Sequence, residues 1–118
     1  MCHVLIIEDE WFIADFLIEL AEEAGATSID TAVTEDEAIA AARDRTPAII
    51  LSDVNLQVGT GPRAVRAIMS EAGAIPVIFI TGTPGDCKPG DPPGVILSKP
   101  IQRRLVVDTF RQLVAHLA

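Results

Sequence analysis

The chain has 118 residues, of which 49% are hydrophobic and 4% aromatic, and its formal net charge is −8. This length predicts one domain over residues 1–118, and the hydrophobic content excludes a disordered chain. The acidic charge argues against direct binding to nucleic acid, which needs clustered Lys and Arg, and against binding to an anionic membrane surface.

No apolar run approaches the ~18 residues of a membrane-spanning helix, and the opening "MCHVLIIEDE" turns acidic too early for a signal peptide. The two cysteines, Cys2 and Cys87, have neither the spacing of a metal site nor that of a disulfide framework. We therefore expect a cytoplasmic protein.

Short apolar runs alternate with helical patterns along the chain. The first helical pattern ends before Gly25, a common helix stop, and the second opens with Thr34 and Glu37, which form a capping box. Pro62 suits the first turn of the third helix. In chain order, strands are predicted over 3–7, 28–33, 48–51, 76–80 and 94–97, and helices over 11–24, 34–45, 62–71 and 102–117.

The first and last predicted helices each carry an apolar stripe with a period of about 3.6 residues, which predicts a face packed on the core. The stripes consist of Phe12, Ile13, Phe16, Leu17, Leu20 and Ala24 in the first helix, and of Leu105, Val106, Thr109, Phe110, Leu113, Val114 and Leu117 in the last.

Alternation of strands and helices predicts an α/β fold with a parallel sheet. The central strands are apolar on both faces, so helices should cover both sides of the sheet. Five strands in a small domain fit the flavodoxin-like order 2-1-3-4-5, in which sites form beyond the carboxyl ends of the strands. The residues that follow each strand are therefore the candidates for function.

Polar side chains follow the central strands of the predicted sheet. Each of them alone is a weak signal, because acidic residues after a strand are usually solvated or cap a helix. Together they supply several carboxylates, a hydroxyl and an ammonium to one edge. They are Glu8, Asp9 and Glu10 after the first strand, Ser52, Asp53 and Asn55 after the third, Thr81 after the fourth and Lys99 after the fifth.

Carboxylates of Asp9 and Asp53 held about 4 Å apart would repel by roughly 4 kcal/mol at an effective dielectric of ~20. A hard divalent cation such as Mg²⁺, or Mn²⁺ in its place, would offset this repulsion. Lys99 would add positive charge beside Asp53, which makes this carboxylate a candidate nucleophile for phosphoryl transfer. The hydroxyl of Thr81 could bind a phosphoryl oxygen.

The stretches "IIEDE", "LSDVNL", "FITG" and "LSKP", in this order, resemble the response-regulator receiver domains (CheY-like) of two-component signalling. The resemblance covers nearly the whole chain. It implies a metal site formed by Glu8 and Asp9, with Asp9 favoured as the direct ligand, by Asp53, and by the backbone carbonyl of Asn55.

The same resemblance assigns the phosphoryl chemistry. It implies Asp53 as the phosphoacceptor, Thr81 as the switch hydroxyl and Lys99 as the phosphate contact. It also implies a cis bond between Lys99 and Pro100, although only about 5–6% of X–Pro bonds are cis in general.

Two features depart from the usual receiver pattern. Ile96 stands where most receivers have a strand-five Tyr or Phe, so the sequence is similar to a subgroup with Phe-x-Thr-Gly in strand four and to receivers of general-stress regulators. The interval between Thr81 and Lys99 holds four prolines and four glycines. Interior Pro costs a helix about 3 kcal/mol and Gly about 1 kcal/mol, so we expect a short fourth helix or a loop.

We thus expect a phosphoacceptor that takes a phosphoryl group from a histidine kinase or a histidine phosphotransfer protein. We expect no DNA-binding or catalytic output domain after Ala118, which predicts signalling through protein binding or relay. The alternative is a metal-dependent phosphatase with an aspartate nucleophile, which usually carries that residue after the first strand. A flavodoxin-like cofactor binder and a receiver that is not phosphorylated fit the residues less well.

Overall fold

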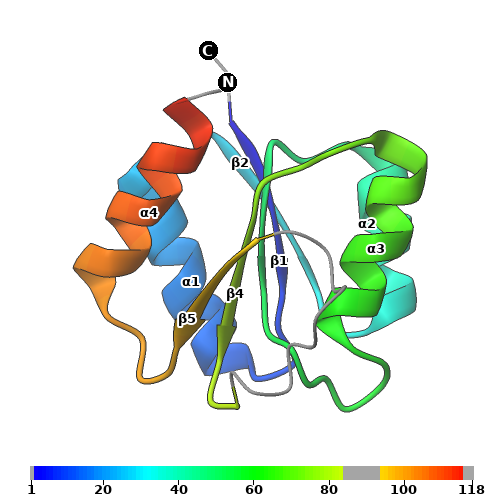
Figure 1. The fold of residues 1–118 in the computed structure, drawn as a ribbon, viewed down its shortest axis with the longest axis horizontal. Helices are drawn as coiled ribbons and strands as arrows, with labels where there is room; N and C mark the ends of the chain where they lie inside the picture. The colour runs from blue at the N-terminus through cyan, green and yellow to red at the C-terminus, as the bar shows by residue number, and fades with distance from the viewer. Residues whose placement is uncertain (1, 84–93, 116–118) are drawn as a thin grey trace.

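The computed structural model describes residues 2–83 and 94–115, and it confirms the α/β fold (Figure 1). In this part of the chain, five strands and four helices follow one another. They are β1 (His3–Ile7), α1 (Trp11–Ala24), β2 (Ser28–Ala32), α2 (Glu35–Asp44), β3 (Ile49–Ser52), α3 (Gly61–Ala72), β4 (Val77–Thr81), β5 (Val95–Ser98) and α4 (Arg103–Ala115).

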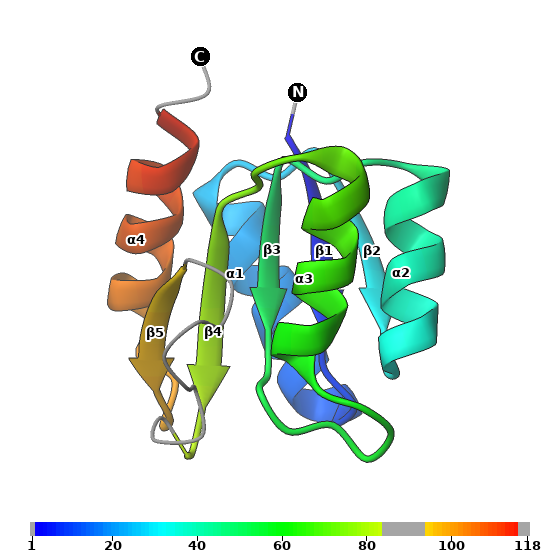
Figure 2. The same cartoon turned by 45° about the vertical axis from the view of Figure 1, so that its right-hand side comes forward.

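The strands form one parallel sheet in the order β2-β1-β3-β4-β5, as predicted. The register aligns the strand ends: Ile7 pairs with Ser52 across β1 and β3, and Thr81 pairs with Ser98 across β4 and β5. All strands point the same way, so their carboxyl ends lie along one edge of the sheet, at the bottom of Figure 2. This edge is where the sequence predicted a site.

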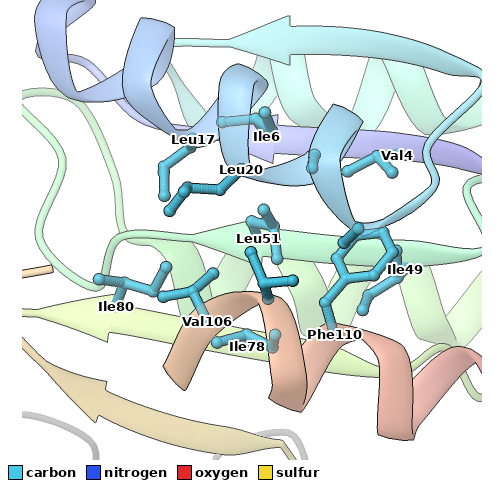
Figure 3. Packing of buried hydrophobic residues seen from close by; sticks show 13 residues of the cluster. Val4, Ile6, Leu17, Leu20, Ile49, Leu51, Ile78, Ile80, Val106 and Phe110 are labelled. Carbon is cyan, nitrogen blue, oxygen red and sulfur yellow. The ribbon is translucent and has the colours of Figure 1, made fainter. Parts of the chain in front are cut away.

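Two helices cover each face of the sheet, α1 and α4 on one side and α2 and α3 on the other (Figure 1). The cluster under α1 and α4 is shown in Figure 3, where Leu17, Leu20 and Phe110 pack on side chains of the central strands. A second cluster, with Phe79 and Val65 among its members, lies under α2 and α3. Both faces are therefore buried, as the apolar strands predicted.

Local signals set several of the helix ends. Gly25 has φ of 117°, and its N–H caps the carboxyl end of α1. The Thr34 hydroxyl accepts from Glu37 N–H at 3.1 Å, and the Glu37 carboxylate accepts from Val33 N–H at 3.2 Å. Thr60 caps α3 in the same way, so this helix begins one residue before Pro62.

The predicted apolar stripes were wrong at Phe12 and Leu105, whose exposed fractions are 58% and 45%. In α1 the line that faces the sheet contains Leu17 and Leu20, and Phe12 lies about 100° away from it on the helix. In α4 the buried side contains Val106, Val107 and Phe110, and Val107 was not on the predicted stripe. A long apolar sequence permits more than one stripe, and contact with the sheet selects one of them.

The predicted replacement of a fourth helix by a Pro/Gly-rich loop falls largely on residues 84–93, outside the described residues, and stays a prediction. Cys87 and Leu117 lie outside them as well. Among the described residues, no helix is both long and apolar enough to cross a lipid bilayer.

The packing predicts that two Phe-to-Ala substitutions differ strongly in their effect on stability. Phe110→Ala should lower the free energy of unfolding by about 3–5 kcal/mol, because it empties a fully buried site. Phe12→Ala should change it by less than about 0.5 kcal/mol, because the ring is mostly exposed. Urea denaturation measures both values, and similar losses in the two variants would contradict the packing described.

Candidate functional site

Three carboxylates meet at the carboxyl edge of the sheet. Glu8 and Asp9 follow β1, Asp53 follows β3, and one oxygen from each lies within 4.8 Å of the others. The backbone places them: Asp53 N–H donates to the carbonyl of Ile7 at 2.9 Å, and Glu8 N–H donates to the carbonyl of Ala32 at 3.0 Å. The sheet ladder thus continues into the site and holds the acidic residues side by side.

Lys99 reaches the same site from the end of β5. Its Nζ lies 3.4 Å from Oδ2 of Asp53 and 3.6 Å from Oε1 of Glu8. Its backbone N–H donates to the carbonyl of Thr81 at 2.8 Å, and its bond to Pro100 is cis, as the resemblance to receivers implied. The ammonium therefore stands between two carboxylates that would otherwise repel each other.

The two oxygens of Asp53 have different partners. Oδ1 accepts a hydrogen bond from Val54 N–H at 2.7 Å, whereas Oδ2 faces Lys99. The Asp53 side chain is 12% exposed and that of Lys99 is 23% exposed, so both groups can be reached from solvent. The Glu8 side chain is only 1% exposed.

The electrostatics of the site favour a bound cation. Burial, and then the charge of Asp53, raises the pKa of Glu8 to about 7. Burial lowers the pKa of Lys99, but attraction to Glu8 and Asp53 outweighs it, so the net pKa lies above its ordinary value. One ammonium among three carboxylates leaves a negative excess, and carboxylate oxygens are the ligands that Mg²⁺ prefers. The donor set therefore fits a hard divalent cation.

Asp9 also connects the site to the loop between β3 and α3. Its Oδ2 accepts a hydrogen bond from Gln57 N–H at 2.7 Å. Within this loop Asn55 forms an antiparallel bridge with Thr60, and Gly61 N–H donates to the carbonyl of Val54 at 2.9 Å. The loop that carries Asn55 is thus held at both ends.

Gly61 is a site residue that the sequence analysis missed. A Cβ at this position would lie 1.8 Å from the carbonyl oxygen of Asp53 and 2.3 Å from Oγ of Ser52. Only glycine lets α3 begin this close to the backbone of Asp53. A glycine beside a helix cap, just after a candidate site loop, is the signal that could have revealed it.

Thr81 and Asn55 are joined through Thr83. The buried hydroxyl of Thr81 accepts from Thr83 N–H at 3.0 Å and lies 3.2 Å from Oγ1 of Thr83. Asn55 Nδ2 donates to that same Oγ1 at 2.8 Å. The structure therefore brings Glu8, Asp9, Asp53 and Lys99 into direct proximity, and it connects Thr81 to Asn55 by a separate hydrogen-bonded link.

Comparison with known proteins agrees with this geometry. Residues 4–88 match the sequence profile of the response regulator receiver domain. The chain belongs to the response-regulator receiver family. This confirms the resemblance stated from the sequence, and receivers of this family are the phosphoacceptor modules of two-component signalling.

Several receiver-containing relatives carry the name PhyR. The Phyllosphere-induced regulator PhyR of Methylorubrum extorquens is 38% identical over 104 residues, which cover 85% of this chain and 39% of that protein. The solution structure of the Erythrobacter litoralis PhyR receiver domain has a TM-score of 0.84 at 34% identity, and covers 97% of this chain and 90% of its own.

A third relative is the crystal structure of the anti-anti-sigma factor PhyR of Bartonella quintana, with a TM-score of 0.82 at 31% identity. The match covers 98% of this chain and 48% of that one. The chain thus spans 39% of the curated PhyR and about half of the Bartonella chain.

The raised pKa of Glu8 predicts a pH-dependent stability in metal-free protein. Between the ordinary pKa of a glutamate side chain and a pH of about 7, the folded state keeps a proton on Glu8 that the unfolded chain has lost. The free energy of unfolding should therefore fall as pH rises through this window, by up to about 3 kcal/mol. Urea denaturation from pH 5 to 8 in a chelator measures the slope.

The matched variants are Glu8→Gln and Glu10→Gln, since Glu10 is an exposed neighbour. In Glu8→Gln the free energy of unfolding should depend less on pH, whereas Glu10→Gln should show the same fall with rising pH as wild type. A decline of equal slope in wild type and Glu8→Gln would contradict the assignment.

Proposed function

We propose that residues 1–118 form one receiver domain that accepts a phosphoryl group on Asp53, with Mg²⁺ or Mn²⁺ bound, in a cytoplasmic phosphorelay. The donor is a phosphohistidine on a histidine kinase or a histidine phosphotransfer protein. The observation that carries this proposal is the convergence of Glu8, Asp9 and Asp53, with Lys99 placed 3.4 Å from Asp53.

The chemistry follows from the partners of each oxygen. Oδ1 of Asp53 is held by Val54 N–H, so Oδ2 is the oxygen that attacks phosphorus. A new P–O bond forms, the P–N bond to the donor imidazole breaks, and its electron pair stays on the imidazole. Lys99 lies on the Oδ2 side and stabilises negative charge on the incoming phosphoryl oxygens.

The metal site would be built from Asp9, Asp53 and the backbone carbonyl of Asn55, with Glu8 beside them. When bound there, Mg²⁺ would neutralise charge on the phosphoryl group and the carboxylates. Because Glu8 is buried and holds a proton up to about pH 7, its ionisation and cation binding support each other. The β3–α3 loop, which the Gln57 N–H ties to Asp9, would offer the Asn55 carbonyl to this site.

Phosphorylation is then read through Thr81. Its hydroxyl sits at the end of β4 and would donate a hydrogen bond to a phosphoryl oxygen. In many receivers this movement is coupled to a strand-five aromatic ring, but here that position is Ile96, which is 44% exposed. Movement of Thr81 must therefore be transmitted to the protein surface without an aromatic ring in β5.

The output is phosphorylation-dependent binding to another protein, or relay, without direct nucleic-acid contact and without turnover of an external substrate. The formal net charge of −8 supports the absence of direct nucleic-acid contact. Similarity to a relative described as an anti-anti-sigma factor favours a partner in the control of transcription initiation. The chain order argues against the phosphatase alternative, because the candidate nucleophile Asp53 follows β3 rather than β1.

Acetyl phosphate with Mg²⁺ tests the phosphoacceptor directly. Wild-type protein should gain the mass of one phosphoryl group, and Asp53→Asn should gain none. The matched control is Asp30→Asn, an exchange of the same kind in β2 on the far side of β1 from β3, which should phosphorylate like wild type. A mass gain that persists in Asp53→Asn, or none in wild type, would overturn the proposal.

A further inference from the structure

We propose that Thr83, supported by the side chain of Asn55, is a positioning residue that holds the Thr81 hydroxyl in its resting place and opposes the phosphorylated state. We call these three residues the threonine latch. The inference rests on the proposed function, because the released state is the one in which Thr81 binds a phosphoryl oxygen.

The latch consists of three short contacts, two between Thr81 and Thr83 and one that links Thr83 to Asn55, which is distant in the sequence. Thr83 N–H donates to the Thr81 hydroxyl at 3.0 Å, and the two hydroxyls lie 3.2 Å apart. Asn55 Nδ2 donates to the Thr83 hydroxyl at 2.8 Å. The link thus runs from the β3–α3 loop to the residues that follow β4.

The chemistry of a hydroxyl makes the resting contacts and phosphate binding compete. Thr81 has one O–H hydrogen and two lone pairs. A β-branched side chain moves between a few staggered rotamers, so the hydroxyl changes its partners when it turns. If Thr81 turns to donate to a phosphoryl oxygen, it gives up the contact with the Thr83 hydroxyl. The contact between the two hydroxyls is lost whether Thr81 or Thr83 is its donor.

Asn55 gives the latch a connection to the phosphoacceptor. It lies two residues after Asp53, and the same residue is the proposed source of a metal-binding carbonyl. Its side chain fixes the Thr83 hydroxyl from one side while Thr81 contacts it from the other. A change in the β3–α3 loop therefore acts on the segment after β4 through a polar link, in a chain that has Ile96 in place of the usual aromatic ring.

Beryllofluoride, bound together with Mg²⁺, mimics the phosphoryl group. Its affinity measures how strongly the latch opposes the phosphorylated state. Thr83→Val keeps the shape and the backbone N–H of Thr83 but removes its hydroxyl, so it should bind the mimic about 3- to 10-fold more tightly than wild type. Thr83→Ser keeps a hydroxyl and should bind within about 2-fold of wild type. Unchanged or weaker binding in Thr83→Val would overturn the latch.

A double-mutant cycle tests whether Asn55 acts through Thr83. Asn55→Ala should tighten binding of the mimic in the wild-type background and have little further effect in Thr83→Val, because the hydroxyl it supports is already gone. Independent, additive effects would show that the two residues do not form one link, and would contradict this part of the proposal.

A second readout separates the latch from the proposed function. Side-chain NMR couplings of Thr81, measured without metal or mimic, should show one rotamer in wild type and Thr83→Ser and a mixture in Thr83→Val. If wild type did not bind the mimic, the proposed function would be wrong, and the Thr81 rotamers would still decide the latch. An identical Thr81 rotamer in all three proteins would overturn it.

Discussion

Repulsion among the carboxylates of Glu8, Asp9 and Asp53 is the constraint around which the whole molecule is arranged. Two unit charges 4 Å apart repel by about 4 kcal/mol even at an effective dielectric near 20. Lys99 offsets part of this repulsion, and a proton on buried Glu8 offsets another part in the absence of a cation. In the proposed function, a divalent cation would replace this proton and prepare the site for a phosphoryl group.

The fold supplies the rigidity that such a site requires. The parallel sheet is buried on both faces, and its hydrogen bonds continue beyond the strands to Glu8 and Asp53. Residues 45 positions apart in the chain are therefore neighbours, and their distance is set by backbone pairing rather than by flexible side chains. Gly61 completes this support, because a side chain there would collide with the Asp53 carbonyl.

Strand ends were the most predictable part of the molecule. Apolar β-branched runs mark the strands, and in a parallel sheet the residues that follow them must share an edge, so the grouping of Asp9, Asp53 and Lys99 could be inferred without coordinates. The phase of the α1 stripe was less predictable, because its sequence is apolar at several consecutive positions. That ambiguity explains why Phe12 was placed on the buried face.

Contacts between loops had no comparable signal in the sequence. The link from Asn55 through Thr83 to Thr81, and the hydrogen bond from Gln57 to Asp9, join segments whose spacing follows no period. They depend on how two loops lie over the same sheet edge.

Cation binding tests the central claim most directly. An amide NMR titration of phosphate-free protein with Mg²⁺ at pH 8 should give saturable shifts at Asp9, Asp53 and Asn55 in wild type. Asp9→Asn should bind Mg²⁺ at least about 10-fold more weakly, because one hard ligand is lost. Absence of saturable shifts in wild type, or equal affinity in the variant, would contradict the account of a carboxylate site built to hold a cation.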